Sequence, residues 1–253
     1  MRDPQLLWPE LPSLLDNVTD VDRIEVKAIL APGRDEPEAL GIDPVDAQVR
    51  QVYYLDTPDL HLYRRGVVLR VRRWRRGADV VIKLRADAPC SVVDGPNGAS
   101  DLVVEVDVLP GSYLRSTALK QAVDPVRVRS VVAGVCPPLT LLSPDQRAIL
   151  EAVAGDVAPD ELTVLGPVTV VKLPAPQLCL GGKTTVEVWH YPDGSRIVEV
   201  SAKCSPAQAV HDAAEVTRAL ADGHVTLSAE QATKTHRTLQ YFAAGVRNRE
   251  RSS

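Results

Sequence analysis

The stretch 52-VYYLDTPDLHLYRRGVVLRVRRWRR-76 carries seven arginines in its second half, in a chain whose net charge is −4. Its segment 66-GVVLRVRRW-74 alternates apolar and basic residues, a pattern that predicts a β-strand with one charged face. Successive strand residues point to opposite faces, so Arg70 and Arg72 share one face and the apolar residues share the other. The fold therefore depends on what this row of arginines faces.

The composition is that of a soluble globular protein. The 253 residues, 45 % hydrophobic and 25 % charged, can form one large domain or two small ones. No window approaches the ~18 apolar residues that span a bilayer, and the first residues lack a signal-peptide pattern, so we expect a cytosolic protein without a membrane partner. The cysteines and histidines are scattered without zinc-site spacing, and the negative net charge argues against nucleic acid as a partner.

Period-two alternation recurs in eight short segments and predicts a mainly antiparallel sheet. Tyr191 to Ser195 read YPDGS, a turn sequence, so the last two segments are expected to form a hairpin. The predicted strands are 22–30, 48–56, 66–74, 79–86, 102–109, 163–173, 185–191 and 195–203.

Helices are predicted at about 112–133, at 144–154 after the N-cap Ser143, and at 205–222 and 228–245. The order strands, helices, strands, helices favours an α+β fold. We expect a barrel domain over 20–205 with a helical insertion at about 112–155. The C-terminal helices, 206–253, are expected to pack on the barrel within a single structural domain.

Sorting the strands by parity gathers ionisable side chains on one face. This face sums to +3, whereas the whole chain carries −4, so the positive charge is concentrated. The bases are Arg23, Lys27, Arg70, Arg72, Lys83, Arg85, Lys172 and Lys203, and the acids are Glu25, Glu105, Asp107, Glu187 and Glu199.

One explanation is the solvated side of an antiparallel sheet. The other is a barrel whose inner wall is charged, with helices covering the apolar outer face. Buried charges are costly unless they are paired, solvated or hold a charged ligand. Arginine and lysine suit phosphate oxygens, and carboxylates suit Mg²⁺ or Mn²⁺, so the mixture suggests a metal-bound polyphosphate.

The segment YLDTPDLHLYRRGVVLRVRR closely resembles the FDTPDLxLxxxGxxLRxR segment of the CYTH superfamily, the triphosphate tunnel metalloenzymes. VVIKLR resembles that family's following strand, VEV its mid-chain acidic strand, and RIEVK stands where its ExExK signature is expected. The resemblance runs from about residue 22 to residue 203.

This resemblance implies an eight-stranded antiparallel tunnel-like β-barrel whose inner wall binds a triphosphate and one or two divalent metal ions, Mg²⁺ or Mn²⁺. Family members include inorganic triphosphatases, thiamine triphosphatases and some adenylate cyclases. By position, the implied substrate ligands are Lys27, Arg70, Arg72, Lys83, Arg85, Lys172 and Lys203, the implied metal ligands are Glu25, Glu105, Asp107 and Glu199, and the implied catalytic pair is Glu25 and Lys27.

The chain departs from the signature at Arg23, which replaces the first glutamate of ExExK. An arginine there weakens metal binding more than anion binding, and metal is what polarises the phosphoryl oxygen in such enzymes. We therefore consider two functions first: metal-dependent hydrolysis of inorganic or organic triphosphate, and non-catalytic binding of polyphosphate or a nucleotide. A third, adenylate cyclase activity, has no residue in the sequence that would position adenine or ribose.

Overall fold

The computed structural model of the chain describes residues 7–31, 33, 36–85, 102–179 and 183–250. Within these residues nine strands are hydrogen-bonded in the order β1-β5-β6-β4-β3-β2-β7-β8-β9, which closes as a barrel. The strands are β1 (Arg23–Leu30), β2 (Gln48–Asp56), β3 (Val67–Trp74), β4 (Gly77–Arg85), β5 (Leu102–Leu109), β6 (Ser112–Val123), β7 (Thr163–Pro174), β8 (Lys183–His190) and β9 (Arg196–Cys204). The predicted α+β barrel is confirmed. β1 and β5 form a parallel pair, whereas β1–β9, β2–β3, β3–β4, β4–β6, β7–β8 and β8–β9 are antiparallel.

The ninth strand, β6, corrects the sequence prediction, which placed a helix at its position. Alanine, leucine, lysine and glutamine favour a helix over 112–123, but pairing with β4 overrides that preference. Leu119 lies opposite Ile82 on β4, and both side chains are buried in one core. Of the predicted insertion at 112–155, only the later part is helical.

Seven α-helices lie among the described residues. The predicted N-cap Ser143 is confirmed at the start of α5, and the structure adds a capping box, because the Ser143 and Gln146 side chains each bond the other residue's backbone. Both C-terminal helices are confirmed with shifted starts, and none of the described helices combines the length and apolarity needed to cross a membrane. The helices are α1 (Leu11–Asn17), α2 (Glu36–Ala39), α3 (His61–Arg64), α4 (Pro125–Val132), α5 (Pro144–Ala154), α6 (Ala209–Asp222) and α7 (Lys234–Glu250).

The chain divides into two compact units, each built from three separate segments. Unit 1 comprises Met1–Val49, Val104–Arg115 and Thr169–Ala232. Unit 2 comprises Arg50–Val103, Ser116–Val168 and Thr233–Ser253. Each unit has its own hydrophobic cluster, so each buries apolar faces of its strands under its own helices.

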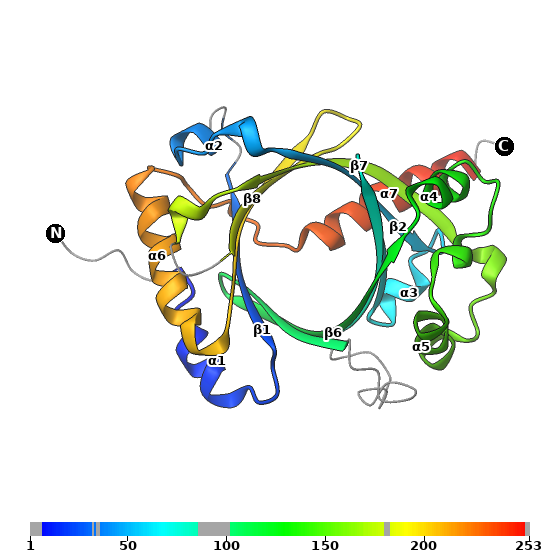
Figure 1. Cartoon of the computed structure of the whole chain (residues 1–253), viewed down its shortest axis with the longest axis horizontal. Helices are drawn as coiled ribbons and strands as arrows, with labels where there is room; N and C mark the ends of the chain where they lie inside the picture. Colours follow the sequence, from blue (N-terminus) through cyan, green and yellow to red (C-terminus); the bar gives the residue numbers. More distant parts are fainter. Residues whose placement is uncertain (1–6, 32, 34–35, 86–101, 180–182, 251–253) are drawn as a thin grey trace. The chain divides into compact units, whose positions relative to one another are not determined.

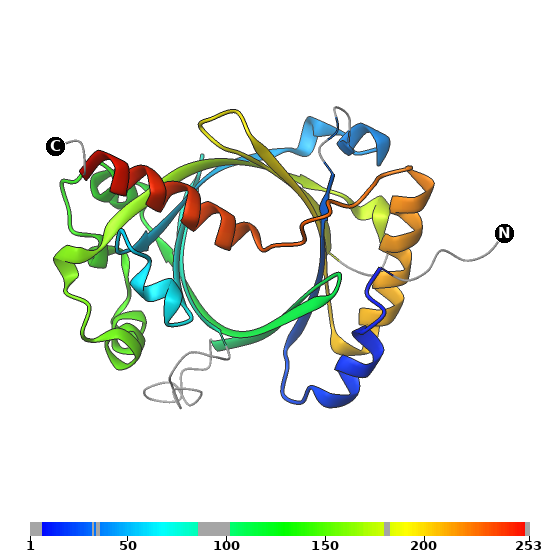
Figure 2. The same cartoon turned by 180° about the vertical axis from the view of Figure 1, so that it is seen from behind.

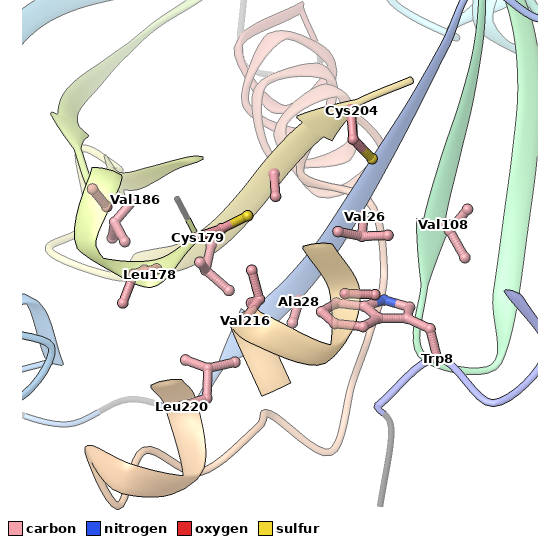
Figure 3. Packing of buried hydrophobic residues seen from close by; sticks show 14 of the residues in the cluster. Trp8, Val26, Ala28, Val108, Leu178, Cys179, Val186, Cys204, Val216 and Leu220 are labelled. Atoms are coloured by element: carbon pink, nitrogen blue, oxygen red, sulfur yellow. The ribbon is translucent and has the colours of Figure 1, made fainter. Parts of the chain in front are cut away.

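In unit 1, α1 and α6 lie side by side and cover the outer, apolar face of β1 (Figure 1). Figure 3 shows part of this core, where Trp8 packs near Val26 and Ala28 of β1 and Val216 of α6. The Trp8 indole is fully buried, and its Nε1 donates to the carbonyl of Lys27 at 3.0 Å. This contact fixes the backbone of β1 at the residue whose side chain points to the opposite, charged face.

In unit 2, α5 packs on the apolar face of β4 and β6. Gln146 is fully buried, and its Nε2 donates to the carbonyls of Val80 and Leu119 at 3.1 Å each. Figure 2 shows α7 passing beside α3, where the Tyr63 hydroxyl and His236 Nδ1 are 3.1 Å apart.

The DTPDL segment forms a tight turn between β2 and β3. Asp56 is 2 % exposed, and its carboxylate accepts hydrogen bonds from the backbone N–H groups of Thr57, Leu62 and Tyr63. Burial raises the pKa of the Asp56 carboxyl, although these three hydrogen bonds act in the opposite direction. The segment with the strongest resemblance to the family therefore has a structural role: its Asp56 carboxylate fixes the backbone of α3, which precedes β3.

Candidate functional site

Unit 1 gathers acids and lysines on one face of β1, β5 and β9. Glu25 lies opposite Asp107 on β5 and opposite Lys203 on β9, and Arg23 lies opposite Glu105. Directly opposed strand residues point to the same side, so the parity predicted for these positions is present in the structure. We call Glu25, Lys27, Glu105, Asp107 and Lys203 the acid–lysine cluster.

Lys27 is the centre of this cluster. Its ammonium Nζ lies 3.0 Å from Glu25 Oε2 and 3.0 Å from Asp107 Oδ1, and its side chain is 13 % exposed. Burial alone lowers the pKa of Lys27, but the carboxylates of Asp107, Glu25 and Glu199 outweigh burial, so the pKa stands well above its ordinary value. Lys27 is therefore a fixed positive charge at any physiological pH.

Other cations of this face form ion pairs with carboxylates of the cluster. Lys203 Nζ is 3.4 Å from Glu25 Oε2 and 3.4 Å from Glu105 Oε1. Arg23, whose side chain is 56 % exposed, approaches Glu105 Oε1 at 3.8 Å. The predicted departure from the signature thus places a guanidinium beside a carboxylate that the resemblance assigns to metal.

Three of the four predicted metal ligands come together. Carboxylate oxygens of Glu25, Glu105 and Asp107 lie within 4.8 Å of one another, and hard oxygen donors of this kind suit Mg²⁺ or Mn²⁺. The fourth, Glu199, is 2 % exposed and acts electrostatically on Lys27, but it is not part of this group of three. The donor set therefore fits a divalent metal ion, although two lysines share the same oxygens.

A second set of charges continues along β7, β8 and β9 of unit 1. Lys172 Nζ lies 3.5 Å from Glu187 Oε1, and the Trp189 indole Nε1 donates to Glu187 Oε2 at 3.1 Å. Glu187 lies directly opposite Glu199, an arrangement of like charges that nearby cations must offset. Lys183, opposite Lys203, shares this face and was absent from the predicted set.

Unit 2 has a basic face of its own on β2, β3, β4 and β6. Tyr54 lies opposite Arg70, and Val68 lies opposite Lys83, so Arg70 and Lys83 point to the same side. The face bears six bases and one acid, which differs from the balanced charge of unit 1. Its charged members are Arg50, Arg70, Arg72, Asp79, Lys83, Arg85 and Lys120.

Arg72 is held by an acid within this face. Its Nε and Nη2 donate to Asp79 Oδ1 and Oδ2 at 2.8 and 2.9 Å, a bidentate pair that Lys120 joins at 3.1 Å. Burial raises the pKa of the Asp79 carboxyl, but hydrogen bonds and charge from Arg72 and then Lys120 outweigh it, so this pKa is lowered. Two nitrogens of Arg72 therefore already bind a carboxylate, and its role as a phosphate ligand stays a prediction.

Arg85 is oriented by α3. Its guanidinium carbon lies 4.6 Å from the centre of the Tyr63 ring, and its Nη2 donates to the Tyr63 carbonyl at 2.8 Å. Tyr63 is in turn bonded to His236 of α7. Tyr63 of α3 thus orients the base that ends β4.

Three charged residues of unit 2 were missed by the sequence reasoning for different reasons. Lys120 lies on β6, which the sequence presented as a helix. Asp79 shares parity with Lys83 and Arg85, so the signal was present but was not followed to the start of the strand. Arg50 lies on β2, where the apolar and polar residues do not alternate cleanly.

Comparison with known proteins gives a fold and no close relative. No protein-family model matches the chain, and no curated protein matches its sequence. A candidate adenylyl cyclase from Hippeastrum with a dominant triphosphatase activity is 16 % identical, with 85 % of this chain and 94 % of that chain covered at a TM-score of 0.61. A candidate adenylate cyclase from Bacillus halodurans is 14 % identical, with coverage of 86 % and 97 % and a TM-score of 0.58. The chain thus shares the fold of these two proteins, and the fold that the resemblance implied is confirmed.

Proposed function

We propose that this protein hydrolyses the terminal phosphoanhydride bond of a triphosphate with the help of Mg²⁺ or Mn²⁺. The observation that carries this function is the acid–lysine cluster, where three carboxylates that can share a metal ion surround a buried, permanently charged lysine. Triphosphatase activity in the Hippeastrum protein, which shares the fold, supports the same reaction class.

Glu25, Glu105 and Asp107 would hold the metal ion, with Glu199 as a further carboxylate nearby. When bound, such an ion polarises a phosphoryl oxygen and neutralises charge on the phosphates. Lys172 and Lys203 already form ion pairs with acids of this face. Both would contact phosphate oxygens once the substrate is bound. In unit 2 we assign the same task to Arg70, Lys83 and Arg85, whereas Arg72 is bound by Asp79 and serves chiefly to hold that face together.

Glu25 and Lys27 act on the reacting atoms. An ammonium has three N–H donors, and two of those on Lys27 point at Glu25 and Asp107, so the third can donate to the phosphoryl oxygen on which charge develops. A Glu25 carboxylate oxygen accepts the hydrogen bond of the attacking water and orients it. The substrate is a small triphosphate or polyphosphate, because lysine and arginine side chains are suited to phosphate oxygens.

Phosphate release from inorganic triphosphate, ATP and thiamine triphosphate, each with Mg²⁺ or Mn²⁺, tests this function. We expect metal-dependent release that falls at least ~100-fold in Glu25→Gln and in Lys27→Met, since both act in the transition state. Glu151→Gln, an exposed change on α5, is the matched control and should keep full activity. No release from any of the three substrates with either metal would contradict hydrolysis, and cyclic AMP formed from ATP would indicate the cyclase reaction instead.

Non-catalytic binding of polyphosphate or a nucleotide is the second candidate, and Arg23 favours it. Arg23 and Lys203 both form ion pairs with Glu105. Cations of the chain therefore already bind a carboxylate that a metal ion would need as a ligand. This function predicts triphosphate binding of the same affinity with metal and with a chelator, measured by titration calorimetry. Binding that requires metal, together with turnover, would exclude it.

A further inference from the structure

Asp212, near the start of α6, is a buried carboxylate that the acid–lysine cluster does not use. The residue is 0 % exposed, and among the residues that the structure describes neither of its oxygens makes a hydrogen bond. Buried polar groups in native proteins almost always have partners, and an unpaired buried carboxylate is costly. Such a group calls for a ligand that completes it.

Two further ligand side chains meet Asp212 inside unit 1. Glu215 follows it by three residues, a spacing that places both acids on one side of the helix. Cys179 follows the short helix η4 (Pro176–Leu178) and is 2 % exposed; Figure 3 shows it in the core beside Val216 of α6. The Cys179 sulfur and one carboxylate oxygen from each acid lie within 4.8 Å of one another.

We propose that Cys179, Asp212 and Glu215 form a second metal site, which takes Zn²⁺ or a similar borderline-soft divalent ion. A thiolate with carboxylates is a donor set typical of zinc, whereas Mg²⁺ prefers oxygen ligands alone. The chemistry of this site therefore differs from that of the three carboxylates around Lys27. Binding breaks the S–H bond of Cys179, releases its proton to solvent and forms the metal–sulfur bond, with no change in oxidation state.

Neighbouring residues fit this assignment. His211 Nε2 lies 3.7 Å from Glu215 Oε1, so the imidazole can orient that carboxylate from outside. The nearby Cys204 has a partner of its own, because its sulfur donates to the Ile24 carbonyl at 3.5 Å. A metal ion here would fasten the segment after η4 to α6, within unit 1.

Cobalt titration of the metal-free, full-length protein tests the site, because Co²⁺ bound by a thiolate gives a near-ultraviolet charge-transfer band that carboxylates alone do not give. We expect one equivalent of Co²⁺ to produce this band, Zn²⁺ to remove it by displacement, and excess Mg²⁺ to leave it unchanged. Cys179→Ser should abolish the band, and Asp212→Asn should weaken Co²⁺ binding at least tenfold. Cys136→Ser, which changes a thiol of unit 2, is the matched control and should leave the band intact.

Thermal unfolding keeps the test decisive if Cys179→Ser does not fold. Zn²⁺ should raise the unfolding temperature of the unmodified protein but not that of Asp212→Asn. Without metal, Asp212→Asn should differ little in stability from the unmodified protein, because asparagine has nearly the same shape and neither Asp212 oxygen makes a hydrogen bond that the substitution would remove. A band that survives Cys179→Ser, Co²⁺ binding unaffected by Asp212→Asn, or the absence of any thiolate band would overturn the proposal.

Discussion

Removing the Asp56 carboxylate should destabilise the protein strongly without changing how it binds substrate. Asp56→Ala leaves the backbone N–H groups of Thr57, Leu62 and Tyr63 without their acceptor, at distances now of 2.8, 2.9 and 3.0 Å. A buried donor left unsatisfied costs about 1–3 kcal/mol, and water entering the turn recovers part of this, so we expect a total loss of ~3–5 kcal/mol. Asp56→Asn keeps an acceptor for two of the three donors and should lose roughly 1–3 kcal/mol.

Urea unfolding followed by circular dichroism measures this loss as a lower denaturation midpoint. Asp59→Ala is the control within the same turn, because Asp59 is exposed and pairs with Arg64 at the surface, so its loss should cost less than ~1 kcal/mol. The Michaelis constant for triphosphate, measured on folded protein, should stay unchanged in Asp56→Asn. A loss below ~1 kcal/mol in Asp56→Ala, or a substrate-binding defect in folded Asp56→Asn, would refute the structural role of the DTPDL turn.

Three further changes test other parts of the structure. Asp79→Asn should destabilise the protein at neutral pH. Because Arg72 lowers the pKa of Asp79, the difference in unfolding free energy between the variant and the unmodified protein should be complete above about pH 4 and should shrink as the pH falls through the lowered pKa. Denaturation at several pH values measures this dependence. Arg23→Glu should strengthen Mn²⁺ binding roughly tenfold by removing a positive charge beside Glu105 and adding a negative one, and unchanged affinity in calorimetry would mean that Arg23 does not act on the metal position. Gln146→Leu should cost about 2–4 kcal/mol in thermal unfolding, because two buried strand carbonyls lose their donor.

Short-range rules predicted much of the fold because the chain obeys them locally. The helix that follows Ser143 begins where its capping box requires, and Glu25 and Lys27 point to the charged face because strand parity is strict over a few residues. β6 was beyond these rules, since its helix-forming residues become a strand only through pairing with a partner some forty residues earlier.

The candidate site was predictable in its residue types and less so in its pairing. Parity showed that acids and bases share a face, but it could not show that Lys27 bridges Glu25 and Asp107, because that contact needs the register of β1 against β5. The bidentate pair of Arg72 and Asp79 likewise depends on the register of β3 against β4. The roles assigned to these residues in catalysis and binding stay predictions until the variants are measured.

The ammonium of Lys27 is a counterion supplied by the protein itself, and it should therefore affect how metal binding depends on triphosphate binding. Two of the carboxylates around it already have this cation as a partner, so we expect the protein to fold without metal. A divalent ion that enters by itself meets a lysine whose raised pKa keeps it charged. A phosphate anion that accepts the third N–H of Lys27 shares its positive charge, so we expect the same carboxylates to attract a metal ion more strongly. Metal and triphosphate should therefore bind with positive cooperativity, each raising the affinity for the other by the same factor.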